Sequence, residues 1–404
     1  MRALTLATLL LAPALAHGAG FQLHERSAAG LGRAFAGEGV IAEDASVLAS
    51  NPAAMLLLPG DTSVAAGTSG IFTGIDVRGA YTPPGGGTPL PAVANDISDN
   101  GYIPYLYLTQ RIHERLSLGF GSFTPFGLKT NYPLSFSARS VADHSSIRTV
   151  NLNPSAALRI NEWWSIGAGF NALYAEGILN ATLPDSRPTL DLTGDDWGYG
   201  FNLGLLFEIG DSSRVGLHYR SPIDLAIEGR AVSVIPALNG PATLDVTLPD
   251  TLTLSGYHGL GERWAIHGEL TWVGWSRFDQ LAPQVVGAPV QPPVSVENWD
   301  DSLRLALGTT WKAGEALTLR AGLAWDESPV DPAFMTLRIP DADRLWLSLG
   351  MSYRFHPCWS LDLGYAHVFA DTARITDGSP ATGVFQGAAD GDADLVSIGI
   401  SGNF

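Results

Sequence analysis

The histidines and serines of this chain are the residues best suited to acid–base, nucleophilic or metal chemistry, and they share no useful spacing. Beyond residue 60 the histidines are scattered at His113, His144, His218, His258, His267, His356 and His367. None of these positions has the spacing of a metal site, and several lie near expected turns. "GISGN" near the C-terminus lacks the G-x-S-x-G spacing of a nucleophile elbow. We therefore expect no enzymatic activity, no metal ion and no cofactor.

The stronger signal is an alternation of large apolar residues with small or polar ones. In "WGYGFNLGLLFEI" (197–209) every second residue is large and apolar, and the residues between are mostly Gly, Asn and Glu. The same alternation occurs at 115–123, 164–174, 302–311, 317–325 and 345–355. Such a pattern predicts strands whose two faces meet different solvents. The runs approach the roughly ten residues that a tilted strand needs to cross a bilayer.

The connections between these runs alternate between tight and long. The tight ones are 112–115, 160–163, 210–213, 259–262, 312–315 and 355–358, and the long ones include 82–100, 281–296 and 371–390. Short turns on one rim and long loops on the other are typical of bacterial outer-membrane barrels. A sheet in hydrocarbon must also close, because an open edge leaves backbone groups unpaired. We predict an all-β fold, a 14-stranded antiparallel transmembrane β-barrel with both chain ends on the periplasmic rim.

The two ends of the chain agree with export to the outer membrane. Arg2, a short apolar core and the small residues around His17 predict a signal peptide over 1–18. The last strand ends on the aromatic Phe404, which resembles the signal read by the barrel assembly machinery. The single Cys358 excludes an internal disulfide, and the net charge of −17 argues against a nucleic-acid partner.

One segment, 19–60, does not alternate. It is rich in Ala, Gly and Ser, has helix-like stretches, and stops at Asn51-Pro52. A barrel of this size has a lumen too wide for its own side chains to fill. We therefore predict a partly helical hatch, or plug, over 19–60 inside a barrel over 61–404. Such a plug also argues against a general porin.

Several of these stretches resemble the FadL-like long-chain fatty-acid transporters of Gram-negative outer membranes. The resemblance is carried by "AGFQLHERSAAGLGRAFAGEGVIAEDASVLASNPAAM", "NLNPSAALRINEWWSIGAGFNALYAEG", "WAIHGELTWVGWSRF" and "WDESPVDPAFMTLRIPDADRLWLSLGMSYRF". It covers nearly the whole mature chain and fails mainly in the long loops. It implies passive uptake of hydrophobic molecules, with long-chain fatty acids as the first expected ligand and aromatic hydrocarbons, which related members carry, as the alternative.

The resemblance also implies roles for particular residues. Asn51, Pro52 and Ala53 match the hatch motif, although Asn-Pro is by itself a common turn. Phe21 and Leu23 lie where the family has an apolar ligand pocket near the mature N-terminus. Pro125, Phe126 and Gly127 match a kink in the third strand that opens the wall laterally. Taken alone, Pro125 could equally end the strand, because proline cannot donate to the ladder.

At several charged positions the chain departs from the family pattern. Family members hold the fatty-acid carboxylate with bases, but "ILNATLP" has none and "PPVSVENWDDSLR" is acidic. The remaining candidates are Arg148, Arg338 and Arg344. In the hatch, Glu43 and Asp44 could pair with Arg304 or Arg320, or be ordinary solvated charges. As partners we expect the hydrophobic ligand, outer-membrane lipid and lipopolysaccharide, with the barrel acting as a monomer.

Overall fold

The computed structural model describes residues 20–183 and 185–404, so the expected signal peptide lies outside the described residues. The strands are β1 Thr62–Thr82, β2 Leu90–Ala94, β3 Gly101–His113, β4 Leu116–Phe123, β5 Gly127–Asn131, β6 His144–Arg159, β7 Trp164–Thr182, β8 Pro188–Ile209, β9 Ser213–Arg220, β10 Ile223–Val232, β11 Gly240–Leu248, β12 Thr251–Leu260, β13 Trp264–Val273, β14 Gln280–Leu281, β15 Gln284–Val285, β16 Ser295–Val296, β17 Ser302–Lys312, β18 Leu317–Asp326, β19 Arg344–His356, β20 Trp359–Ala370, β21 Ala373–Ser379 and β22 Gly383–Asn403. The helices are α1 Ala28–Leu31, α2 Glu38–Ile41, α3 Val47–Ser50 and the 3₁₀ turns η1 Pro52–Leu57, η2 Pro236–Leu238, η3 Trp275–Arg277 and η4 Pro332–Phe334.

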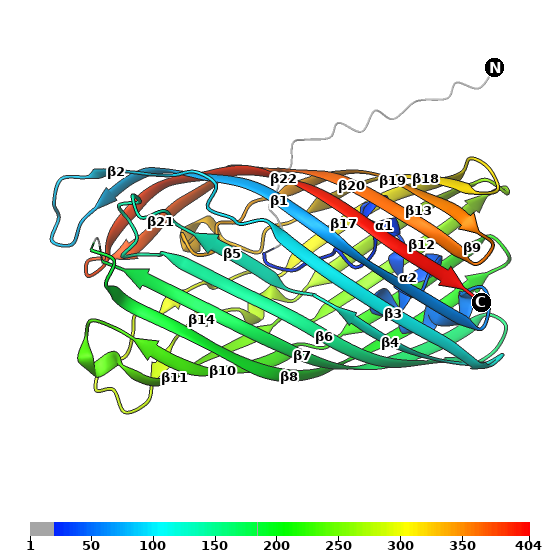
Figure 1. The fold of residues 1–404 in the computed structure, drawn as a ribbon, viewed down its shortest axis with the longest axis horizontal. Helices are drawn as coiled ribbons and strands as arrows, with labels where there is room; N and C mark the ends of the chain where they lie inside the picture. The colour runs from blue at the N-terminus through cyan, green and yellow to red at the C-terminus, as the bar shows by residue number, and fades with distance from the viewer. Residues whose placement is uncertain (1–19, 184) are drawn as a thin grey trace, which may run out of the picture.

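The strands form a closed antiparallel barrel (Figure 1). Closure is made by β1 and β22, which pair from Ser63 opposite Asn403 to Thr82 opposite Val384. Several strands of the wall are built of two segments, among them β2 with β3, β4 with β5, β9 with β10, β11 with β12, and β20 with β21. The predicted 14-stranded barrel is confirmed.

The alternation has the predicted cause, because the large apolar side chains face outward. In β17, Leu305 is 46% exposed whereas its neighbour Arg304 is 2% exposed. In β8, Phe201 is 47% exposed and Asn202 is fully buried. Exposed apolar side chains along the long strands, with buried polar residues between them, are what a lipid-facing wall around a lumen requires.

The tight links all lie on the rim that also carries Phe404, and the long links lie on the opposite rim (Figure 1). One expectation about the long links was wrong. Residues 371–390 contain β21 and the start of β22, which pair from Ala373 opposite Ala389 to Ser379 opposite Gly383. Here the wall extends beyond the lipid, so the outward residues are polar and the alternation that marks the other strands disappears.

The hatch segment, which we define as residues 20–60, lies inside the barrel toward the short-turn rim (Figure 1). Helix α1 contacts β19, β20 and β22, α2 contacts β9 and β12, and η1 contacts β6, β7 and β8. Strands on all sides therefore surround this segment, and nearly all of its side chains are buried. Among the described residues, no helix is long and apolar enough to cross a bilayer.

Candidate functional site

An apolar cavity lies between the hatch segment and the long-loop rim. Its wall is almost wholly hydrophobic and comes from β5 to β8, β10, β11 and the loops after β13 and β18. Its lining includes Leu128, Ile147, Ile178, Leu192, Ile227 and Leu244. A cavity wall of this composition is typical of a binding site for an apolar molecule.

Arg338 supplies the positive charge on this apolar wall. Its side chain is buried and donates to the hydroxyl of Ser145 (3.3 Å) and to the carbonyls of Asn180 (3.0 Å) and Val141 (3.1 Å). Burial lowers its pKa, and the carboxylates of Asp377 and Glu297 act against that shift. Within the described part of the chain no carboxylate lies at ion-pair distance from Arg338, so its charge is available to an anionic ligand.

Phe21 closes the hatch side of the cavity and is held in an aromatic cage. Its ring centroid lies 4.7 Å from that of Trp275, 5.5 Å from Phe278, 5.7 Å from Trp299 and 6.0 Å from Phe126. Edge-to-face pairs of this kind stabilise by about 0.5–1.5 kcal/mol each beyond the burial of area. The cage therefore fixes where the N-terminal end of the hatch segment lies.

Arg344 and Asp341 clamp the backbone of Gly20, next to Phe21. The Gly20 N–H donates to Asp341 Oδ2 (2.9 Å), and Arg344 donates to the Gly20 carbonyl (3.1 Å). The two side chains also form an ion pair of 2.5 Å. Arg344 is therefore committed to the hatch segment and does not line the apolar cavity.

The third strand is interrupted where Pro125 was expected to kink it. Phe123 pairs with Asn151 and Gly127 pairs with Arg148, so three residues, 124–126, stand opposite two of β6. The hydroxyl of Thr149 replaces the ladder by bonding to both the N–H and the carbonyl of Phe126. Beyond this point, in the described residues, β5 pairs in the sheet only with β6, and its edge toward β3 is left without a strand.

The hatch segment fills part of the gap that the interrupted third strand leaves in the wall. Leu23 N–H donates to the Pro125 carbonyl (2.8 Å), and Gly127 N–H donates to the Phe21 carbonyl (3.0 Å). The residues between, Gln22 and Phe126, form an antiparallel bridge. Residues 21–23 are thus a short additional strand on the interrupted wall, held by few hydrogen bonds.

Asn51 fixes the other end of the hatch segment. Its Oδ1 accepts from the Ala53 N–H (3.1 Å) and caps η1, while its Nδ2 donates to the Leu205 carbonyl of β8 (3.0 Å). The contact is so close that only glycine fits on the wall: a Cβ at Gly204 would lie 2.0 Å from Asn51 Oδ1, and one at Gly167 would lie 2.3 Å from the Ala53 nitrogen. These two glycines explain part of the small inner face of the alternating strands.

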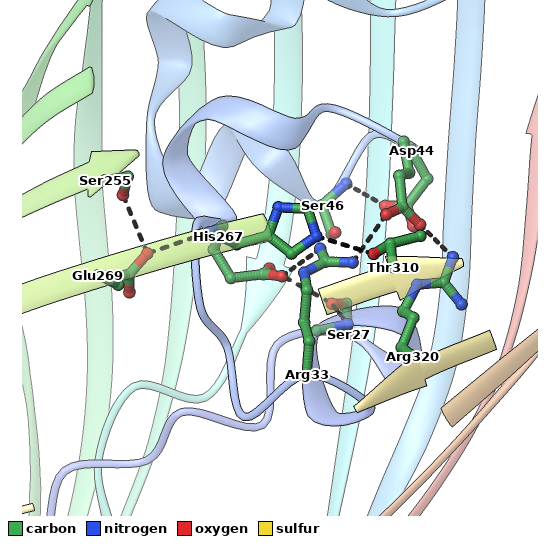
Figure 2. A network of polar contacts seen from close by, with 12 residues as sticks. Ser27, Arg33, Asp44, Ser46, Ser255, His267, Glu269, Thr310 and Arg320 are labelled. Atoms are coloured by element: carbon green, nitrogen blue, oxygen red, sulfur yellow. Dashed lines mark hydrogen bonds and ion pairs between the residues drawn. The ribbon is translucent and has the colours of Figure 1, made fainter. Parts of the chain in front are cut away.

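Charged groups join the middle of the hatch segment to the wall (Figure 2). Arg33 pairs with Glu38 (2.5 Å) and Glu43 (2.7 Å), and Glu43 pairs also with Arg320 of β18. Burial acts to raise the pKa of Glu43, but the guanidiniums of Arg320 and Arg33 hold it down at about 2. Of the two predicted hatch acids, then, Glu43 pairs with one of the two suggested arginines.

Asp44 is placed differently from its neighbour. It accepts from the Ser46 N–H (2.8 Å) and forms no ion pair in the described structure (Figure 2). Burial, with a contribution from the Asp362 carboxylate, raises its pKa to about 6. The other suggested arginine, Arg304, donates instead to the Ala34 carbonyl (2.9 Å).

The remaining expected residues are spread around the site. Arg148 lies on the outward face of β6, with its side chain 81% exposed. Leu23 lines a second, polar cavity instead of the apolar one. Trp275, Phe278, Trp299 and Asp341 were missed, because they lie outside the alternating strands. Trp275 and Phe278 in "GWSRF" break the alternation at the end of a strand, which was an available signal.

The chain matches known proteins along almost its whole length. Residues 9–404 match the family described as "Outer membrane protein transport protein (OMPP1/FadL/TodX)". The long-chain fatty acid transport protein of Salmonella typhi is 33% identical over 400 residues, covering 90% of each chain. Outer membrane protein P1 of Haemophilus influenzae is 32% identical over 411 residues, covering 89% of this chain and 88% of that protein.

Solved structures share the fold. A Pseudomonas aeruginosa FadL homologue superposes with a TM-score of 0.84 at 23% identity, over 96% of this chain and all of the other. The toluene transporter TodX of P. putida superposes with a TM-score of 0.68 at 18% identity, over 94% and 98% of the two chains. The family is one of transport proteins and not of enzymes. This chain is therefore a member of the OMPP1/FadL/TodX family and a β-barrel of the Gram-negative outer membrane.

Proposed function

We propose that this protein carries long-chain fatty acids passively across the outer membrane. The observation that carries the proposal is the apolar cavity with the buried, unpaired Arg338 on its wall. Burial of each methylene stabilises a bound chain by about 0.8 kcal/mol, and the guanidinium pairs with the carboxylate. The relatives named long-chain fatty acid transport proteins support this choice of ligand.

A tightly held ligand needs a change of structure to leave. In our proposal residues 1–18 are a signal peptide, 19–60 a hatch and 61–404 the barrel, and the part of the hatch that moves is its first few residues. Phe21 and Leu23 are bound to the interrupted third strand by two backbone hydrogen bonds, whereas Asn51–Ala53 are packed directly against wall backbone. Displacement of residues 20–23 would join the cavity to the gap at Pro125–Gly127 while the rest of the hatch stays docked.

An aromatic hydrocarbon is the second candidate ligand. The observation that favours it is the cage of Trp275, Phe278 and Trp299 around the Phe21 ring, because a free aromatic molecule could take the place of that ring. The structural likeness to toluene transporters shows the shared fold and leaves this choice to experiment.

Uptake assays decide between the two ligands. Cells that lack their own transporter would receive the wild type, Asn51→Ala or Arg338→Gln, and labelled oleate, oleyl alcohol and toluene would be compared. We expect oleate uptake by the wild type and less by Asn51→Ala. Arg338→Gln should lower oleate uptake about tenfold and leave oleyl alcohol unchanged, because only the acid needs a counter-charge. Uptake of toluene without oleate, from a folded barrel, would move the assignment to aromatic hydrocarbons.

The other proposals concern partners and excluded functions. We propose that the barrel works as a monomer in lipid and lipopolysaccharide, and that Phe404 is read by the assembly machinery. We also propose that this protein is neither a general porin nor an outer-membrane hydrolase. A porin would show steady ion conductance in a planar bilayer, whereas a lumen filled by residues 20–60 should show almost none.

A further inference from the structure

A second cavity lies on the other side of the Phe21–Phe126 contact and is polar. Its lining combines residues of the hatch segment with β9, β12 and β13, and it includes Pro125 and Phe126 of the interrupted strand. This polar cavity therefore stands directly behind the gap in the wall. The apolar cavity ends at Phe21, and the two share no lining residue.

Arg26 is the unusual group in the polar cavity. In the described structure its guanidinium makes no hydrogen bond and no ion pair, and its Nε is buried without a partner. The second arginine of the lining, Arg220, is anchored to the Ala49 carbonyl (2.9 Å) and to Asn171. An arginine confined in a protein without a carboxylate is costly unless something else satisfies its donors.

Other buried polar atoms of the same lining also lack partners. His218 is 4% exposed, and its Nε2, the His24 Nε2 and the Ser50 hydroxyl have no hydrogen-bond partner within the described residues. Burial, with Arg304 and Arg26 nearby, lowers the pKa of His24 well below its usual value, so that ring is neutral. The charges of the lining are thus those of Arg26, Arg220 and the acid Glu269.

Glu269 lies on the same lining and interacts with the charge of Arg26, but in the described structure the two side chains form no ion pair. Its Oε2 accepts from the Glu38 N–H (3.0 Å) and the Ser255 hydroxyl (2.9 Å), so it is turned toward α2 and β12 (Figure 2). The lining therefore keeps an excess of positive charge and of unsatisfied donors. That combination suits a small anionic group with several acceptor oxygens, such as a carboxylate.

We propose that the polar cavity is a second carboxylate subsite, in which Arg26 receives the head group of the cargo as the chain leaves the apolar cavity. This inference rests on the proposed function. A charged carboxylate is strongly disfavoured in hydrocarbon, so a head group beside the gap needs a counter-charge until the tail has entered the lipid. Arg338 pairs with the carboxylate while the chain occupies the apolar cavity, and Arg26 pairs with it while the chain leaves through the gap.

Binding of a carboxylate beside Arg26 can be tested by an experiment that does not depend on transport. Crystals of the purified full chain would be soaked in bromoacetate, a carboxylate with an anomalous scatterer. We expect bromine signal beside Arg26 in the wild type and none there in Arg26→Gln. Wild-type crystals without bromine at Arg26 would overturn the subsite, whatever the cargo proves to be.

The role in transport is tested by uptake of oleate and uncharged oleyl alcohol in cells that lack their own transporter. Arg26→Gln should lower oleate uptake about tenfold and leave oleyl alcohol unchanged, and Arg26→Lys should restore much of the loss. Arg78→Gln, which removes an exposed arginine of β1 paired with Asp76, should change neither.

The outcomes separate the two proposals. Equal loss of both cargoes in Arg26→Gln would show damage to the hatch and overturn the carboxylate role. Unchanged oleate uptake in that variant would do the same. A wild type that takes up no oleate would instead defeat the proposed function, and the bromoacetate soak would still decide whether Arg26 binds a carboxylate.

Discussion

The rings of Phe21 and Phe126 meet edge to face, with 6.0 Å between their centroids, and each lines a different cavity. Phe21 belongs to the hatch segment and Phe126 to the interrupted third strand. Their contact is therefore both the partition between the apolar and polar cavities and the attachment of the hatch to the wall.

Truncating this partition should weaken ligand binding. Phe21→Ala removes an aromatic wall from the apolar cavity and opens it toward Phe126. Since burial of a whole Phe side chain is worth about 1.5–3 kcal/mol, the dissociation constant for oleate should rise about tenfold or more. Equilibrium binding to the purified barrel measures this. Phe21→Leu keeps most of the apolar area and should stay within a few-fold of the wild type, and an unchanged constant in Phe21→Ala would contradict a role in the pocket.

A methyl group at Gly204 should dislodge the Asn51 end of the hatch. The added Cβ would lie 2.0 Å from Asn51 Oδ1, so Gly204→Ala must displace the cap of η1. Loss of such a cap costs about 1 kcal/mol, and residues 51–57 should exchange their amide hydrogens several times faster. Gly256→Ala is the matched control, because the nearest atom to its Cβ is 4.0 Å away. Equal protection in the two variants would mean that the close contact does not hold the hatch.

Weakening the clamp on Gly20 should free the first residues of the hatch while its core stays in place. Asp341→Asn removes the ion pair with Arg344 and the charged acceptor of the Gly20 N–H. A hydrogen bond to a charged group contributes about 1.5–3 kcal/mol, so exchange of the Leu23 and Gly127 amides should accelerate at least about tenfold. The Asn51 amide, bonded to Val47, serves as the internal reference. Uniform acceleration at all three positions would indicate general loosening instead.

The hatch should also loosen as the pH rises through the range of Asp44. Its pKa is about 6 in the folded protein and 3.8 ordinarily, so the folded state holds the proton more tightly. This stabilising contribution is complete below about pH 4 and is lost as the pH rises through 6, a change of about 3 kcal/mol. Glu43 acts oppositely but only below its ordinary value of 4.5. Hydrogen exchange of residues 42–50, corrected for intrinsic rates at about pH 5 and about pH 7.5, should show about half of this change, and Asp44→Asn should abolish it.

The barrel could be predicted from the sequence because lipid imposes a two-residue period that nothing else imposes over such lengths. Leu305 and Arg304 illustrate it, with adjacent side chains on opposite sides of one wall. Where the wall continues into water, as at Ile375 in β21, only the inward residues stay apolar and the period could not be recognised. The extra length of β21 and β22 was therefore missed.

Little of the site could be predicted from the sequence alone. The interruption at Pro125 was expected from the family resemblance, since local chemistry allowed an ordinary strand end equally well, and the pairing of Glu43 with Arg320 was one of several alternatives. The sequence could not show which of Arg148, Arg338 and Arg344 lines the apolar cavity, because that depends on which way each side chain points. A one-residue change of register separates the outward Arg148 from the inward Thr149, and nothing in the composition around them records that choice.

The position of Pro125 along the third strand also sets a depth in the bilayer. Nine residues separate it from Leu116, where β4 leaves the short-turn rim. At about 3.3 Å per residue and a tilt of about 40°, the gap stands roughly 20 Å above that rim, near the top of a lipid band about 25 Å tall. The stacked Trp264 and Trp311 at the same rim mark the inner interface from which this height is counted. A molecule that left sideways at this height would enter the outer leaflet, and reaching the periplasm would still require a flip across the membrane midplane.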